Sequence, residues 1–263
     1  ILTNEWVWNS PFYGKIVKYA DFYPVANGIE QSIEKLSELV KNGYSIVVFP
    51  EGTRSEDCSI RRFHKGAFYL AERLNLDIVP VMIHGMGHVL PKTELHLRRG
   101  ACTLKIYDRV KPSDKSFGND YVERSKNFRR FYSAEYNELA KHIETAEYFK
   151  DRVLHNYIYK GPAVEWQARR ILKKKSAFAV VNRLPETGMV VFINSGYGTL
   201  PLLAALVKKE LQVFGIEKDE EKRLLAENCV SRPANLAYVA SVDEIPGYDS
   251  NDLTITLTED EAV

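Results

Sequence analysis

The sequence predicts an α/β protein, because short apolar runs alternate with amphipathic segments along the chain. Residues 27–41 carry apolar side chains at spacings of three and four, which predicts a helix between Asn27 and Gly43. The run Ser45–Phe49 is β-branched, too short for a helix and followed by Pro50, so it predicts a buried strand. A helix and two further strands of this part are expected at 66–74, 77–84 and 102–107.

A polar stretch at 110–120 interrupts this pattern. Residues 121–159 are rich in charged residues and tyrosine, with apolar side chains at helical spacing, and predict one or two connecting helices. A second α/β pattern starts at Gly161. Its expected helices are 164–174, 200–209 and 218–227, and its expected strands are 189–194, 212–216, 236–240 and 253–257.

These patterns predict three parts of the chain: a first α/β domain over residues 1–111, a helical connector over 112–160 and a second α/β domain over 161–263. The second domain has fewer strands than an open parallel sheet usually needs, so we expect the chain to stop within it. The first residues have neither an initiator Met nor the order of a signal peptide. We therefore also expect the chain to start inside a longer protein.

The composition is that of a folded protein. Of the 263 residues 45% are hydrophobic and 27% are charged, and no apolar stretch approaches the length of a membrane span. The three cysteines, Cys58, Cys102 and Cys229, are widely spaced and fit neither a disulfide framework nor a zinc site, which favours a reducing location.

The net charge of +1 conceals an asymmetry. Residues 217–263 contain 12 acidic and four basic residues, which leaves +9 for residues 1–216. A basic surface suits anionic lipid, phosphorylated substrates or nucleic acid. The chain has no interleaved basic and aromatic motif, so no nucleic-acid partner is expected. The nine basic and eight acidic residues of 112–160 indicate a solvated helical face.

The segment Phe49–Ser55 has the residue types of a phosphate-binding turn. Gly52 allows backbone N–H groups to approach an anion, Thr53 offers a hydroxyl, and Arg54 offers a planar guanidinium. Glu51 suits hydrogen bonds from a polyol, or the orientation of Arg54. The alternative is a surface turn with an ordinary Glu–Arg pair.

This segment resembles the glycerolphosphate and lysophospholipid acyltransferase family, which includes the lysophosphatidate acyltransferases. Three more matches follow the family's order along the chain. They are the opening segment Glu5–Gly14, then Phe63, Lys65 and Gly66, then Val79-Pro80-Val81. The resemblance implies an acyltransferase-type mixed α/β sheet domain over residues 1–111.

The resemblance also implies an enzyme of phospholipid biosynthesis that transfers an acyl chain from an acyl thioester to a lysophospholipid or glycerol-phosphate acceptor. The implied donor is acyl-CoA or acyl carrier protein, and acyl transfer needs no cofactor. The residues implied to hold the acceptor are Glu51, Gly52, Thr53, Arg54 and Lys65.

Two features of the family are not found in this sequence. The family's catalytic pair is a His with an Asp five positions later, in which the Asp orients the His general base, and none of the six histidines has such a partner. The pair is expected upstream, so this chain is expected to be inactive; the alternative is a non-catalytic lipid-binding or scaffold module. The family's Arg near the acceptor phosphate is also missing from Phe22–Ala26, which leaves Arg61, Arg62 or Lys65 as substitutes.

Seven aromatic residues lie within the first 23, together with Lys15 and Lys18. This composition is typical of a membrane interface, although a core cluster explains it equally well. With the resemblance, it suggests the cytoplasmic face of a membrane, bound peripherally or tethered by another part of the protein. His84 and His88 are not expected to bind metal, because Gly85 and Gly87 make a helix between them unlikely.

The second domain resembles the first half of a Rossmann-like class I methyltransferase that uses S-adenosylmethionine, on the segments 189–198 and 212–217. The resemblance implies that Gly196 and Gly198 admit a nucleoside and that Glu217 binds its ribose hydroxyls. Phe192 replaces the family's acidic residue. Cofactor binding is doubtful on this pattern, and a methyltransferase-like fragment as the main functional part is a further alternative. The residues that would line the nucleoside site are Asn194, Gly196, Gly198, Glu217 and Asp243.

Overall fold

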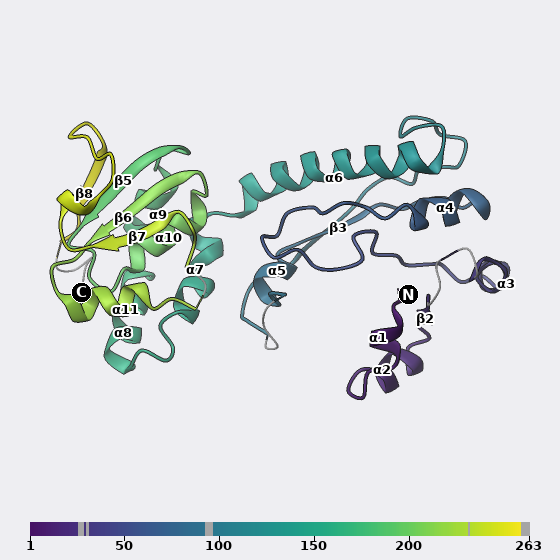
Figure 1. The fold of residues 1–263 in the computed structure, drawn as a ribbon, viewed down its shortest axis with the longest axis horizontal. Coiled ribbons are helices and arrows are strands. Elements are labelled where there is room, and N and C mark those ends of the chain that lie inside the picture. Colours follow the sequence, from purple (N-terminus) through teal and green to yellow (C-terminus); the bar gives the residue numbers. More distant parts are fainter. Residues whose placement is uncertain (26–28, 30–31, 93–96, 231, 259–263) are drawn as a thin grey trace. The chain divides into compact units, whose positions relative to one another are not determined.

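The computed structural model describes residues 1–25, 29, 32–92, 97–230 and 232–258 and divides the chain into two compact units. The first contains Ile1–Leu95 and Cys102–Glu138, and the second contains His96–Ala101 and Leu139–Val263. Figure 1 shows the long helix α6 (Tyr121–Ile143), whose residues up to 138 belong to the first unit. The expected connector 112–160 is therefore shared between the two units.

The first unit contains short strands and helices. Its strands form two small sheets: β1 pairs with β2 in parallel, and β3 pairs with β4 antiparallel, with Val81 opposite Ile106. Asp120 caps α6 through hydrogen bonds of 2.8 Å from the backbone N–H groups of Val122 and Glu123. The other elements are β1 (Leu2–Thr3), α1 (Glu5–Trp8), α2 (Gly14–Tyr19), β2 (Tyr23–Pro24), α3 (Ile33–Lys41), α4 (Gly66–Arg73), β3 (Val81–His84), α5 (Met86–Val89) and β4 (Thr103–Ile106).

An aromatic cluster forms the core of this unit. Phe63 and Phe68 pack with Val110 and with Phe128 of α6, all of them buried. The rings of Phe117 and Phe128 stack with centroids 4.0 Å apart. The predicted helices at 27–41 and 66–74 correspond to α3 and α4, although Asn27 lies outside the described residues.

The expected buried strand Ser45–Phe49 is wrong. The segment is extended but belongs to no sheet among the described residues, and its one backbone bond to a neighbouring strand runs from the N–H of Leu2 to the carbonyl of Val47, at 3.0 Å. Val47 and Phe49 are 46% and 58% exposed, whereas Ile46 and Val48 are half-buried. The apolar run is therefore covered on one side only, and the turn after it does not lie at the edge of a sheet.

The expected strand 77–84 is shorter and less buried than predicted. Only its last four residues form β3, in which Val81 is 41% exposed and Met82 is buried. Directly after it, α5 is a one-turn helix. The prediction that Gly85 and Gly87 make a helix unlikely here is therefore wrong. Gly85 has a φ of +90° and starts the helix from the left-handed region, while a Cβ at Gly87 would lie 2.5 Å from the sulfur of Cys58. The glycines thus permit this helix.

The second unit is built on one parallel sheet of four strands in the order β7-β6-β5-β8. All four strands lie where the sequence predicts them, and Figure 1 shows the sheet among its helices. The 3-10 turn Val242–Glu244 follows β7. The elements are α7 (Ala146–His155), α8 (Pro162–Ile171), α9 (Lys175–Asn182), β5 (Gly188–Ile193), α10 (Thr199–Val207), β6 (Leu211–Ile216), α11 (Glu220–Glu227), β7 (Leu236–Val239) and β8 (Leu253–Thr256).

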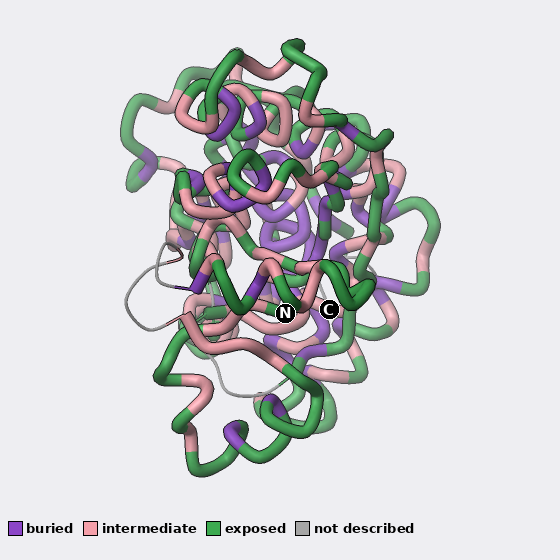
Figure 2. The backbone as a smooth tube through the Cα atoms, turned by 90° about the vertical axis from the view of Figure 1, so that its right-hand side faces the viewer, coloured by how far each residue is buried: buried purple, intermediate pink, exposed green. Residues whose placement is uncertain are grey.

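The sheet has an apolar layer on each face. Val190 and Phe192 of β5 point into the main core, to which α10 contributes nearly all of its residues, whereas Val191 packs in a second cluster with Ile216. This is the two-residue alternation of a strand that is buried on both faces. Figure 2 shows the buried residues along the backbone. In the part of the chain that the structure describes, no helix is both long and apolar enough to cross a membrane.

Candidate functional site

In the first unit, Glu51 closes a loop around the predicted phosphate-binding turn. The Gly52 N–H donates to the carbonyl of Phe49 at 3.0 Å, and the φ of +68° at Gly52 lies in the left-handed region. The half-buried carboxylate of Glu51 accepts a hydrogen bond of 2.8 Å from the N–H of Arg61. Glu51 therefore joins the two ends of a ten-residue loop, while Thr53 stays exposed within it.

The guanidinium of Arg54 contacts backbone carbonyls. Its Nη1 donates to the carbonyl of Leu90 at 2.8 Å and to that of Pro91 at 3.3 Å. These bonds fasten the turn to the segment after α5. They occupy one nitrogen of the guanidinium. The side chain is exposed, and its other N–H groups form no hydrogen bond with the described residues.

Two residues that the sequence did not single out border this turn. A Cβ at Gly52 would lie 3.1 Å from the Nε2 of His64, so the imidazole lies directly against the glycine. Tyr132 of α6 donates to the carbonyl of Val81 at 3.3 Å, and burial is the main reason that its pKa rises to about 12, with Glu51 adding to the rise. The sequence offers a weak signal for His64, which lies between Phe63 and Lys65, and none for Tyr132.

A groove of about 970 Å³ runs beside the turn. Most of the residues that line it are apolar, and they include Val40 and Phe128. Glu51 and Tyr132 contribute its polar groups near the turn. The exposed faces of Val47 and Phe49 belong to its lining. The arrangement combines a polar turn with a long apolar surface, which suits an amphiphile.

Of the five predicted acceptor residues, only Glu51 lines this groove, and Lys65 lies elsewhere. It precedes α4 and lines a separate, smaller pocket together with Arg62 and residues of α6. Glu51, Gly52, Thr53 and Arg54 lie together in one turn because they are consecutive.

In the second unit, Glu217 holds the glycine loop after β5. Its carboxylate accepts from the N–H of Gly196 at 2.7 Å and from the N–H of Asp219 at 3.0 Å. Asn194 adopts a φ of +57°, a conformation that asparagine tolerates better than most residues, and turns the chain from the strand into the loop. The loop and Glu217 meet because β5 and β6 are parallel neighbours.

Two buried tyrosines hold the same loop in place through hydrogen bonds to its backbone carbonyls. The hydroxyl of Tyr157 donates to the carbonyl of Tyr197, and that of Tyr238 to the carbonyl of Gly198, both at 2.9 Å. Burial raises the pKa of both hydroxyls, which keeps them protonated as donors. A Cβ at Gly198 would lie 2.3 Å from the hydroxyl oxygen of Tyr238. The close neighbour that requires glycine at this position is therefore Tyr238.

Phe192 and Asp243 differ in their surroundings. Phe192 is fully buried in the main core, so no side chain at that position points to the loop. Asp243 is exposed on the 3-10 turn after β7, at the same carboxyl edge of the sheet as the glycine loop and Glu217. The five predicted nucleoside residues thus share one edge.

Comparison with known proteins bears on the first unit. The family model named Acyltransferase matches residues 1–84. The acyltransferase match covers α1 to β3 and includes the turn Glu51–Arg54. It confirms the acyltransferase resemblance that the turn and its neighbouring motifs indicated.

Two curated relatives and one solved structure are similar to parts of this chain. A 1-acyl-sn-glycerol-3-phosphate acyltransferase of Chlamydomonas reinhardtii is 34% identical over 82 residues, which are 31% of this chain and 25% of that protein. One of Cocos nucifera is 30% identical over 130 residues, 47% of this chain and 42% of that protein. The crystal structure of the 1-acyl-sn-glycerophosphate acyltransferase of Thermotoga maritima aligns with a TM-score of 0.44 and 28% identity, over 52% of this chain and 55% of that one. The chain thus spans less than half the length of these curated relatives.

Proposed function

We propose that the first unit is the acceptor-binding part of a phospholipid acyltransferase, which transfers an acyl chain from an acyl thioester to a lysophosphatidate-type acceptor. The observation that carries the proposal is the acyltransferase match over the turn Glu51–Arg54, which is held closed by Glu51 beside an apolar groove. The polar turn suits the phosphoglycerol end of the acceptor, and the groove suits its hydrocarbon chain.

The test is a calorimetric titration of the chain with oleoyl lysophosphatidate, and R54A is the variant. We expect R54A to weaken binding by about 1.5–3 kcal/mol, the scale of a hydrogen bond to a charged group. R73A is the matched control, because Arg73 is an exposed arginine of α4 outside the turn. Equal affinity of R54A and the unchanged chain would contradict the acceptor role.

Turnover is a separate question. None of the six histidines is followed by Asp at the fifth position, so we expect this chain to release no free thiol from acyl-CoA above background in the presence of lysophosphatidate. Turnover by the chain would show that another of its residues acts as the base.

We propose further that α1 and α2 contact a membrane surface on its cytoplasmic side. Five apolar or aromatic residues of α1, of α2 and of the turn between them are largely exposed. Their exposure argues against a core cluster, which was the alternative explanation of the aromatic composition. The five residues are Trp6 (74%), Phe12 (82%), Tyr13 (57%), Ile16 (65%) and Tyr19 (93%). Lys15 and Lys18 lie on the same short hairpin and suit anionic headgroups.

Co-sedimentation with vesicles tests membrane binding by α1 and α2, and the second unit offers a matched control. W6A/Y19A should lose co-sedimentation with phosphatidylcholine vesicles that contain phosphatidylglycerol. W166A/Y159A removes a Trp and a Tyr that are 60% and 90% exposed, and should keep it. Equal binding of the two double variants would reject a role for the hairpin.

A nucleoside site in the second unit is the second candidate function. The fastened loop 195–198 beside Glu217 favours it, because a carboxylate that accepts two N–H bonds still has lone pairs for ribose hydroxyls. Phe192 removes a carboxylate that could hold the ligand, so we expect S-adenosylmethionine to bind no better than high micromolar. A dissociation constant below about 10 μM in a titration would contradict that expectation.

A further inference from the structure

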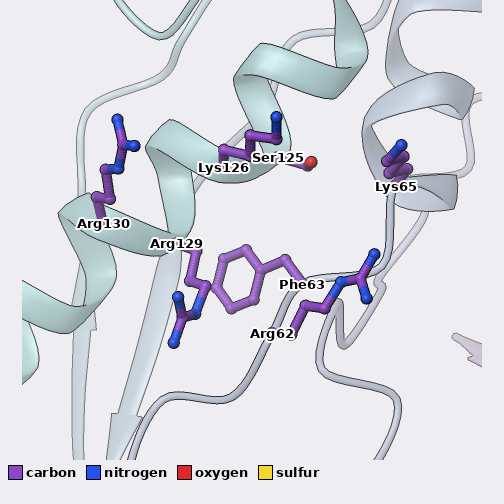
Figure 3. A pocket seen from close by; sticks show the side chains of 7 residues that line it. All are labelled: Arg62, Phe63, Lys65, Ser125, Lys126, Arg129 and Arg130. Atoms are coloured by element: carbon purple, nitrogen blue, oxygen red, sulfur yellow. The ribbon is translucent and has the colours of Figure 1, made fainter.

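A second pocket of the first unit is lined almost entirely by cations. It has a volume of about 260 Å³ and lies between the segment before α4 and the first half of α6. Figure 3 shows that Arg62 and Lys65 come from the first of these segments and the other basic residues from the helix. Its lining residues are Arg62, Phe63, Lys65, Ser125, Lys126, Arg129 and Arg130, and they include no carboxylate.

No carboxylate of the described residues neutralises these cations. None of the five forms an ion pair with a carboxylate among the described residues. The nearest acidic residue in sequence, Glu123, accepts from the N–H of Asn119 at the start of α6. Lys126 and Arg130 are four apart on the helix and repel each other, which costs a few tenths of a kcal/mol without a bound anion. The charge arrangement therefore favours an anionic ligand.

The base of the pocket is rigid. Phe63 is 5% exposed, and its ring packs edge-on against Tyr132 with centroids 5.4 Å apart. The Nε of Arg129 donates to the carbonyl of Arg61 at 3.2 Å, which fixes α6 against this segment. Both sides of the pocket are thus held in place, and the remaining guanidinium N–H groups are left for a ligand.

The charged ends point in different directions: those of Arg129 and Arg130 lie on one side of Phe63, and those of Arg62 and Lys65 lie on the other (Figure 3). A ligand with two linked or adjacent phosphate groups brings charge to both sets of cations, which suits this divided arrangement better than a single phosphate does. We propose that this pocket binds a phosphate-rich anion, either a diphosphate ester in solution or neighbouring phosphates of lipid headgroups. The site is separate from the turn Glu51–Arg54, and three of its cations lie outside the acyltransferase match.

The test uses K126Q/R130Q, which changes two exposed residues of α6 and leaves the acceptor turn and Lys65 intact. In the first arm, inorganic pyrophosphate is titrated into the full chain, and inorganic phosphate serves for comparison. We expect pyrophosphate to bind more tightly than phosphate and K126Q/R130Q to weaken it about tenfold or more, as expected for lost charge-assisted bonds. K35Q/K41Q removes the same charge from α3 and should leave the affinity unchanged.

The second arm measures co-sedimentation with phosphatidylcholine vesicles with and without phosphatidate. A loss specific to K126Q/R130Q in the pyrophosphate arm supports the site and identifies a soluble source, and a specific loss in the phosphatidate arm supports it with a lipid source. Unchanged binding of K126Q/R130Q in both arms, or an equal loss in K35Q/K41Q, overturns the proposal. Circular dichroism verifies that the variants are folded. Because the acceptor turn is untouched, a failure of this site leaves the acceptor-binding proposal standing.

Discussion

Gly198→Ala should destabilise the second unit more than an ordinary glycine replacement. Gly198 has a φ of +76°, and a Cβ there would lie 2.3 Å from the hydroxyl oxygen and 2.6 Å from the Cζ of Tyr238. That ring cannot withdraw easily, because it is buried and lies against Gly215, its register partner on β6. The substitution therefore adds a steric overlap to the strain of a left-handed alanine.

The matched control is Gly247→Ala. Gly247 has a φ of +71° in the same unit, and a Cβ there would meet no atom within 4 Å. Left-handed strain alone should cost G247A roughly 1–2 kcal/mol, and overpacking should add roughly 1–3 kcal/mol to that cost in G198A. We therefore expect about 2–5 kcal/mol of destabilisation for G198A.

Urea unfolding followed by circular dichroism measures both free energies of unfolding under the same conditions. Because both glycines lie in the second unit, the difference between the variants reports the overlap with Tyr238. If G198A and G247A lose the same free energy, Tyr238 does not constrain the loop and the reasoning fails.

Three further predictions concern single contacts. E217Q removes the charge that accepts from the N–H groups of Gly196 and Asp219, so it should cost about 1–3 kcal/mol in urea unfolding and speed hydrogen exchange at both amides. R54A removes the bonds to the carbonyls of Leu90 and Pro91, so hydrogen exchange should become faster in α5; unchanged exchange would argue against this contact. For Tyr132, burial raises the pKa to about 12, so above pH 10 the unfolded chain loses this proton first and stability falls. Between pH 9 and pH 11 the unchanged chain should therefore lose about 1 kcal/mol more than Y132F in urea unfolding, and equal losses would refute this assignment.

The elements of the second unit could be predicted almost completely from the sequence. The strand β5 is a short apolar run between polar turns, and such a run is recognisable because both faces of a central parallel strand are buried. The strand β8 at the end of the sheet order is mostly exposed and alternates apolar residues with threonine. The helix α9 was not predicted, and it follows α8 after a break of three residues.

The first unit shows where the same pattern fails. Ser45–Phe49 is as apolar as β5, yet it pairs with no strand among the described residues and exposes Val47 and Phe49 to the groove. An apolar run indicates that its side chains favour burial. It does not indicate whether a neighbouring strand or another apolar surface covers them.

By itself, the sequence determined the local chemistry: the turn Glu51–Arg54, the glycines of the loop 195–198 and the position of Glu217. Only the tertiary structure decided which groups these residues meet. Arg54 contacts carbonyls 36 and 37 positions away, and Gly198 is packed under Tyr238, 40 positions away. Local spacing governs turns and helices because neighbouring residues interact within a few bonds, whereas contacts across such separations depend on how the whole chain packs.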